Sequence, residues 1–187
     1  MKRIGIFLII ISILLIGVIA FSVTGNMVKN HNTTHNVKVK LETTKGDIII
    51  ELYKEMPVTA GNFKKLVSEG FYDGVIFHRV IDGFMIQGGD PTGTGTGGPG
   101  YEIKDEFTKT SLDENDRGTI AMANAGPNTG GSQFFINLVD NNHLDKKHPV
   151  FGIVIKGMDV VDAIARVATD EDDKPIEDVK IVKASMI

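Results

Sequence analysis

Two stretches are far more specific than a structural scaffold requires: Phe77-His-Arg-Val-Ile-Asp-Gly-Phe-Met-Ile-Gln-Gly-Gly-Asp90 and Met122-Ala-Asn-Ala-Gly-Pro-Asn-Thr-Gly-Gly-Ser-Gln-Phe-Phe-Ile136. The first places a single arginine, Arg79, among aromatic and thioether side chains. The second is a loop rich in glycine, proline and asparagine that leads into Gln133 and two phenylalanines. An arginine beside apolar groups is costly to bury unless it has a partner or a task. The residues alone leave two interpretations of Arg79 open. It is either a structural cation that pairs with a carboxylate on a barrel wall, or a functional group.

Short strand-like runs surround these stretches. Alternating apolar and charged residues from Val37 to Glu42, the Lys45-Gly46 turn and the run 47–53 predict a β-hairpin. Apolar residues at helical spacing predict helices over residues 57–69 and 158–167. The other predicted strands are residues 75–80, 84–87, 118–122, 133–138, 150–155 and 179–183. Residues 37–187 are therefore expected to form one mainly β domain, a closed eight-stranded antiparallel β-barrel capped by two α-helices, because closure removes exposed strand edges.

The N-terminus has a different character. Met1-Lys-Arg precedes a run, residues 4–23, that contains no charged side chain. A helix of this length spans roughly 30 Å, the thickness of a hydrocarbon core. We expect residues 1–23 to form one N-terminal transmembrane helix, with Lys2 and Arg3 cytoplasmic and the domain outside. A cleaved signal peptide, which would leave the domain secreted, is the alternative.

Residues 24–36 are polar and predict a flexible tether. The chain has 24 Asp and Glu against 20 Lys and Arg, a net charge of −4, and no cysteine. An acidic chain without a basic cluster argues against a nucleic-acid partner. The absence of cysteine excludes disulfides and thiolate metal sites. The run Thr92-Gly-Thr-Gly-Thr-Gly-Gly98 lacks the Lys-Ser/Thr of a phosphate-binding loop, so we expect a plain connection there.

In its two motif stretches the chain resembles the cyclophilins. The Phe-His-Arg, Phe-Met-x-Gln-Gly-Gly-Asp and Gly-Ser-Gln-Phe-Phe runs occur in family order, and the resemblance extends from Val37 to Ile187. It implies a β-barrel with an active groove on its outer wall. It also implies peptidyl-prolyl cis-trans isomerase activity on proline-containing polypeptides, needing no cofactor and assisting protein folding.

The resemblance also implies roles for particular residues. Arg79 is implied as the catalytic cation. The implied proline pocket consists of Phe84, Met85, Phe135 and Leu144, with His148 at its edge. Contacts to the substrate backbone are implied for Gln87, Gln133, Ala123, Asn124 and Ala125. His78, Ile81 and Gly95 match further groove positions, and His78 is expected to play a supporting part.

One position departs from the family pattern. His143 precedes Leu144 where many cyclophilins carry a tryptophan that is linked to cyclosporin binding, and the chain has no tryptophan. Weak inhibition by cyclosporin is therefore expected. His143 and His148, as residues at a pocket rim, need no metal, and we expect none. The competing function is a proline-peptide receptor, but binding alone does not call for a cation at the bond that rotates.

Overall fold

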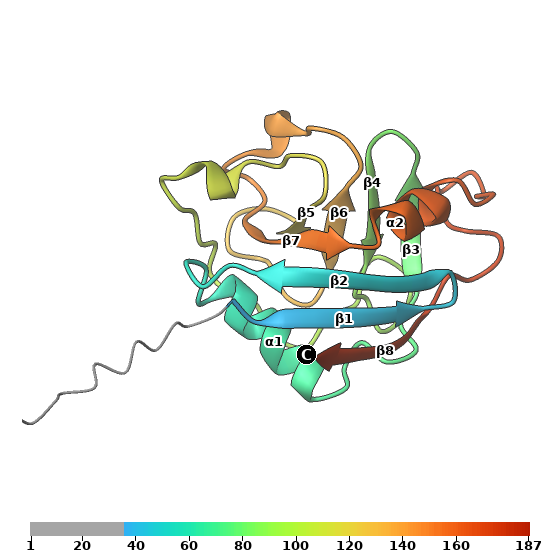
Figure 1. The fold of residues 1–187 in the computed structure, drawn as a ribbon, viewed down its shortest axis with the longest axis horizontal. Helices are drawn as coiled ribbons and strands as arrows, with labels where there is room; N and C mark the ends of the chain where they lie inside the picture. The colour runs from blue at the N-terminus through green and yellow to red at the C-terminus, as the bar shows by residue number, and fades with distance from the viewer. Residues whose placement is uncertain (1–35) are drawn as a thin grey trace, which may run out of the picture. The chain divides into compact units, whose positions relative to one another are not determined.

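The structure, a computed structural model, describes residues 36–187 (Figure 1). The predicted membrane segment, residues 1–23, and nearly all of the predicted tether lie outside the described residues. Within 36–187, none of the helices combines the length and the apolar character needed to cross a bilayer.

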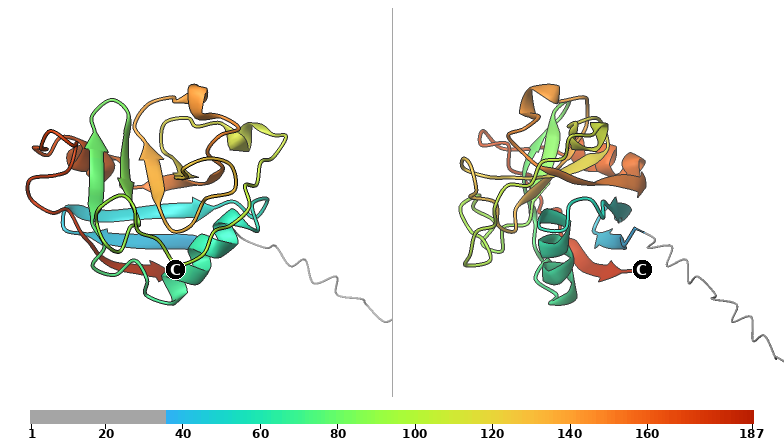
Figure 2. Two further views of the ribbon diagram at one scale, coloured as in Figure 1. Left: turned by 180° about the vertical axis from the view of Figure 1, so that it is seen from behind. Right: turned by 90° about the vertical axis from the view of Figure 1, so that its left-hand side faces the viewer.

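Eight strands form one antiparallel sheet that curves into a half-barrel (Figures 1 and 2). The strands are β1 (Lys38–Thr43), β2 (Gly46–Leu52), β3 (Phe77–Ile81), β4 (Met85–Gly88), β5 (Thr119–Met122), β6 (Phe134–Asn137), β7 (Val150–Lys156) and β8 (Ile181–Met186). Their order across the sheet is β3-β4-β6-β5-β7-β2-β1-β8. All eight predicted strands are present, with ends that shift by a few residues.

The predicted full closure of the barrel is not found. The end strands β3 and β8 do not pair along their length, and an isolated bridge joins Ile76 to Lys180 instead. Beside it, the Phe77 amide donates to the Val179 carbonyl oxygen at 2.9 Å. Because Phe77 is the first residue of β3, the rest of that strand has no partner in β8, and the sheet remains a half-barrel.

Two helices pack on this sheet, as predicted. Helix α1 (Thr59–Ser68) contacts β7 and β8, whereas α2 (Met158–Ala165) contacts β2, β3 and β4. Helix α1 begins two residues later than the sequence indicates. The Val58 and Thr59 amides both donate to the Glu106 carboxylate at 2.9 Å. This distant side chain caps the helix, and its negative charge also favours the positive end of the helix dipole.

The core lies on the inner face of the sheet. Phe63 of α1 contacts the rings of Tyr72, Phe134 and Phe151, with ring centroids 5.0, 5.4 and 5.2 Å apart. All four side chains are fully buried. Because side chains alternate along a strand, the residues between the core positions of β3, β4 and β6 point to the outer face.

Candidate active site

Strand register brings Arg79 onto the same face as the predicted pocket. Arg79 on β3 lies opposite Gln87 on β4, and Gln87 lies opposite Phe135 on β6. Phe135 in turn lies opposite Ala121 on β5. Residues directly opposite each other share a face, so these four form one row across the outer surface, which we call the outer row. Two strand spacings, about 10 Å of sheet, separate Arg79 from Phe135.

An apolar area adjoins the outer row. Met85 lies two residues before Gln87 on the same face of β4, opposite Ile81 on β3. Met85 and Phe135 are only 2% and 4% exposed, although they face away from the core. Phe84 and Leu144 are half-buried and pack against the buried apolar residues of the domain, which include Met85 and Phe135. The predicted proline-pocket residues are therefore together, and the area is open to solvent at Phe84 and Leu144.

Histidines form the edge of this area. Phe84 stacks on His143 of η2 (Asn142–Leu144), with centroids 6.1 Å apart and rings tilted by 21°. His148 meets Phe135 edge-on at 5.5 Å. Burial lowers the pKa of His148. The hydrogen bond that its Nδ1 donates to the Met122 carbonyl oxygen at 3.1 Å opposes this shift without cancelling it. His148 is therefore neutral at pH 7 and packs as an uncharged ring.

A buried asparagine network supports the same edge. Asn141 Nδ2 donates to the Phe84 carbonyl oxygen and to Asn137 Oδ1, both at 2.9 Å. Asn137 Nδ2 donates to Asn115 Oδ1 at 3.2 Å and to Thr119 Oγ1 at 2.9 Å. The three asparagines are at most 3% exposed. They tie the turn that carries Phe84 to the segment that leads into η2.

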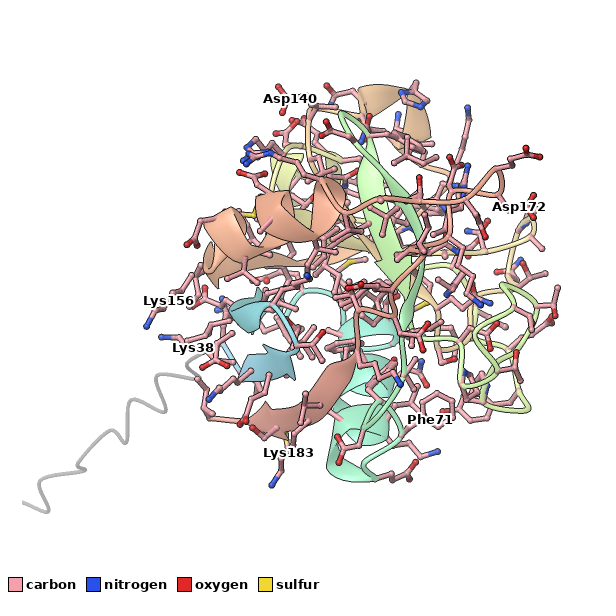
Figure 3. The ribbon with its side chains drawn as sticks, turned by 90° about the vertical axis from the view of Figure 1, so that its right-hand side faces the viewer. Lys38, Phe71, Asp140, Lys156, Asp172 and Lys183 are labelled. Carbon is pink, nitrogen blue, oxygen red and sulfur yellow. The ribbon has the colours of Figure 1, made fainter. Side chains whose placement is uncertain are left out.

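Arg79 is accessible. Its side chain is 45% exposed, and its Nε lies 3.7 Å from Asp173 Oδ2, which belongs to an equally exposed loop. Figure 3 shows that loop with Asp172 labelled. Exposed pairs of this kind contribute about 0–1 kcal/mol. Arg79 therefore does pair with a carboxylate, but the pair is exposed and weak, and its guanidinium remains accessible from solvent.

His78 lies behind Arg79 and not in the outer row. It is 7% exposed, and neither ring nitrogen has a hydrogen-bond partner among the described residues. Burial lowers the pKa of His78; Asp90 opposes this shift, and Lys174 and Arg79 add to it. A Cβ placed on Gly95 would lie 3.7 Å from the ring, so the neutral imidazole packs beneath the Gly95 loop.

The predicted groove segment Ala123–Asn124–Ala125 follows β5 without belonging to it. The Ala123 amide donates to the Gln133 carbonyl oxygen at 3.0 Å, and Asn124 Nδ2 donates to the Lys147 carbonyl oxygen at 2.8 Å. Within residues 36–187, the backbone N–H and C=O of Asn124 have no partner. An unpaired N–H and C=O at an edge can hydrogen-bond an extended peptide.

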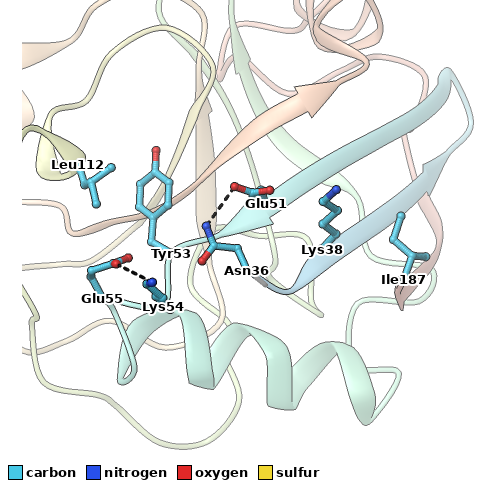
Figure 4. A pocket seen from close by; sticks show the side chains of 8 residues that line it. All are labelled: Asn36, Lys38, Glu51, Tyr53, Lys54, Glu55, Leu112 and Ile187. Carbon is cyan, nitrogen blue, oxygen red and sulfur yellow. Dashed lines mark hydrogen bonds and ion pairs between the residues drawn. The ribbon is translucent and has the colours of Figure 1, made fainter. Parts of the chain in front are cut away.

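Two hollows of similar size lie on the surface. One, of about 850 Å³, lies between the Gly95 loop and the Ala123–Ala125 segment, and Gln87 and Gln133 line it. The other, of about 820 Å³, is lined by Asn36, Lys38, Glu51, Tyr53, Lys54, Glu55, Leu112 and Ile187 (Figure 4). No predicted site residue belongs to this second hollow, so it is separate from the candidate site.

Several residues that shape the site were not predicted. They are Asp90, Asn115, Asn137, Asn141 and Asp173. Asn and Asp normally indicate turns, and nothing in the local pattern marks a buried amide network. Asp90 is the exception, because an Asp followed by Thr two residues later is typical of a side chain that caps its own loop.

Comparison with known proteins agrees with this geometry. The family model described as cyclophilin type peptidyl-prolyl cis-trans isomerase/CLD matches residues 38–186. The peptidyl-prolyl cis-trans isomerase ppi1 of Schizosaccharomyces pombe is 52% identical over 150 residues, which cover 78% of this chain and 96% of that protein. The peptidyl-prolyl cis-trans isomerase CYP71 of Arabidopsis thaliana is 54% identical over 152 residues, which cover 79% of this chain but only 24% of that longer protein.

Solved structures are similar as well. The crystal structure of a Cryptosporidium parvum cyclophilin type peptidyl-prolyl cis-trans isomerase is 36% identical with a TM-score of 0.78, covering 82% of this chain and 98% of that one. A second structure of that protein, in the presence of the dipeptide Ala-Pro, is 37% identical with a TM-score of 0.76, covering 80% and 98%.

Proposed function

Because this chain belongs to the cyclophilin type peptidyl-prolyl cis-trans isomerases, we propose that Arg79 is the cation that accelerates rotation about X-Pro bonds, with the proline ring held against Phe135 and Met85. The substrates are proline-containing polypeptides, whose folding the enzyme assists. The Ala-Pro dipeptide in the related crystal structure supports this substrate class.

The chemistry needs no proton transfer. The barrier to rotation is about 18–20 kcal/mol, because the C–N bond has partial double-bond character. In the twisted state amide resonance is lost and lone-pair density returns to the prolyl nitrogen. A guanidinium directed at that nitrogen stabilises the twisted state more than either planar isomer, which is the condition for catalysis.

Arg79 cannot supply the whole acceleration. The uncatalysed reaction takes tens to hundreds of seconds, so reaching milliseconds requires about four decades, or about 5.5 kcal/mol. A hydrogen bond from a charged group contributes about 1.5–3 kcal/mol net. The apolar area around Phe135 and Met85 must provide the rest, by holding the ring in a dry setting while the preceding carbonyl turns.

The observation that carries this proposal is the outer row. Register places a solvent-accessible arginine, a glutamine and a buried phenylalanine side by side on one face, next to Asn124 with its unpaired backbone groups. A peptide whose backbone pairs with Asn124 would pass over Phe135 toward Arg79. A proline receptor would bind its peptide over the same residues but would not require the cation.

Replacing Arg79 tests the proposal. We expect Arg79→Ala to lower kcat/KM by about 10- to 100-fold, because about 1.5–3 kcal/mol of transition-state stabilisation is lost, while peptide binding is partly retained. The measurement is a protease-coupled assay with a proline-containing peptide. Arg117→Ala is the matched control, since Arg117 is an equally exposed arginine, 46% exposed, that pairs with Asp162 and is not one of the predicted site residues. Equal losses in the two variants, or unchanged activity in Arg79→Ala, would remove Arg79 from this role.

We further propose that residues 1–23 anchor the domain on the outer face of a membrane, so that its substrates are exported or membrane-proximal proteins. The uncharged run of residues 4–23 behind Lys2 and Arg3 supports this proposal.

Fractionation of cells that express the full chain tests the anchor. We expect the chain to stay in the membrane fraction after alkaline extraction and to be cut by protease added outside the cytoplasm. Leu14→Arg should release it, because an arginine at the centre of a spanning helix costs about 2.5–3.5 kcal/mol. A chain shortened at its N-terminus and recovered in the medium would instead favour the cleaved signal.

A further inference from the structure

The loop from Asp90 to Gly97 is built around a buried carboxylate. Asp90 is fully buried. Its Oδ1 accepts from the amide and hydroxyl of Thr92 at 2.7 and 2.8 Å. Its Oδ2 accepts from the amides of Thr94, Gly95 and Gly97 at 3.1, 2.7 and 3.0 Å. The loop therefore wraps its N–H groups around one negative charge.

The hydrogen bonds around Asp90 favour its ionised form. Burial opposes ionisation, but the hydrogen bonds from Gly97, Thr92 and Gly95 outweigh it and hold the pKa of Asp90 well below its usual range. Charge-assisted hydrogen bonds are roughly twice as strong as neutral ones. The loop is accordingly held more firmly than the high backbone freedom of its three glycines would suggest.

The other side of the loop is linked to the outer row through Gln133. Gln133 Nε2 donates to the carbonyl oxygens of Gly95 and Gly97 at 3.0 and 2.9 Å. Since carbonyl oxygens only accept, the amide of Gln133 must turn its nitrogen to the loop and its oxygen away. That oxygen accepts from Gln87 Nε2 at 2.9 Å. The side-chain amide of Gln87 is therefore oriented with its nitrogen toward Gln133. Its Oε1 remains available as an acceptor in the outer row, which contains Arg79.

From this chain of contacts, we propose that Asp90 is a positioning residue for the isomerase site: through the Gly95 and Gly97 peptides it sets the amide orientation of Gln133 and Gln87. The oriented Gln87 Oε1 is then available to the Arg79 guanidinium or to a substrate N–H. Asp90 is buried and acts only through the loop. The inference rests on the proposed function of the outer row.

A glycine pair in the same loop gives a second way to perturb the contact. A Cβ on Gly97 would collide with Asp90 Oδ1, whereas a Cβ on Gly98 would meet no atom within 4 Å. Neither glycine has a left-handed backbone, so the two substitutions differ mainly in what the added methyl group meets.

The primary experiment compares two buried carboxylates. Asp90→Asn keeps the shape but replaces one accepting oxygen with an NH₂ group. We expect kcat/KM in the protease-coupled assay to fall about tenfold, and the side-chain amide NMR signals of Gln87 and Gln133 to move. Asp113→Asn changes a carboxylate that is 5% exposed and lies outside this chain of contacts. It should keep kcat/KM within about twofold and leave those signals in place.

Gly97→Ala and Gly98→Ala keep the proposal testable if Asp90→Asn does not fold. Gly97→Ala should reproduce the loss of activity and the signal shifts, and Gly98→Ala should produce neither. A folded Asp90→Asn or Gly97→Ala protein with wild-type kcat/KM, or with unmoved glutamine signals, overturns the positioning role. That result leaves the proposed function intact. The proposed function is tested separately, and it fails if the wild type is inactive, if Arg79→Ala is fully active, or if Arg79→Ala and Arg117→Ala lose activity equally.

Discussion

At the scale of single residues, two buried aspartates show how hydrogen-bond donors control a charge. Asp90 has donors on both oxygens. Asp113 accepts from the Val150 amide at 3.4 Å, while its Oδ2 has no partner among the described residues. Burial therefore raises the pKa of Asp113 to about 6; the Val150 hydrogen bond opposes the shift, and Asp145 adds to it. Burial alone does not fix the charge of a carboxyl group, because the donors around it decide whether the charged form is compensated.

Asp113 predicts a pH dependence of stability. Its folded-state pKa of about 6 lies above the ordinary aspartate value of 3.8, so the folded state binds more protons than the unfolded state between these pH values. The free energy of unfolding therefore falls as Asp113 loses its proton between about pH 4 and pH 6, and this loss of stability persists at higher pH. Asp113→Asn should raise the free energy of unfolding at pH 7.5 by about 1–2 kcal/mol and flatten the profile in that window. Urea unfolding at several pH values measures this, and a variant that is less stable at pH 7.5 contradicts it.

At the scale of elements, the site is assembled from segments that do not follow one another in the sequence. Strand order β3-β4-β6-β5 places Arg79, Gln87 and Phe135 in one row, although β5 precedes β6 in the chain. The turn before β4 supplies Phe84 and η2 supplies Leu144. The asparagine network joins these two segments, so it determines where the open side of the apolar area lies.

Removing the centre of that network should destabilise the protein. Asn137→Ala deletes partners of Asn141, Asn115 and Thr119 and leaves their polar atoms buried. We expect a loss of about 2–3 kcal/mol in urea unfolding, because each unsatisfied buried group costs about 1–3 kcal/mol.

The control for this prediction is a surface asparagine, Asn142, which follows Asn141 of the network in the chain. Asn142 Nδ2 donates to Asp116 Oδ1 in an exposed pair. Asn142→Ala should therefore cost less than about 0.5 kcal/mol. Similar losses in Asn137→Ala and Asn142→Ala would show that the buried network adds no stability.

At the scale of the whole molecule, the inner and outer faces of the half-barrel have separate tasks. The inner face holds the aromatic cluster around Phe63, and the outer face holds the candidate site. Phe134 and Phe135 illustrate the division, because neighbouring residues of one strand point to opposite faces. The first completes the core, and the second forms the floor of the apolar area. Substrate can thus be bound without opening the core.

The sequence by itself determined the strands, the two helices and the group of residues near Arg79, because periodicity and turn residues act over short distances and the motif runs are specific. Only the tertiary structure decided how far the sheet closes and which polar groups support the site. Phe77 meets Val179, Glu106 caps α1, and Asn137 finds its partners through contacts between segments that are brought together only on folding. Such contacts depend on the register and packing of the whole chain, and a local pattern of residue types does not encode them.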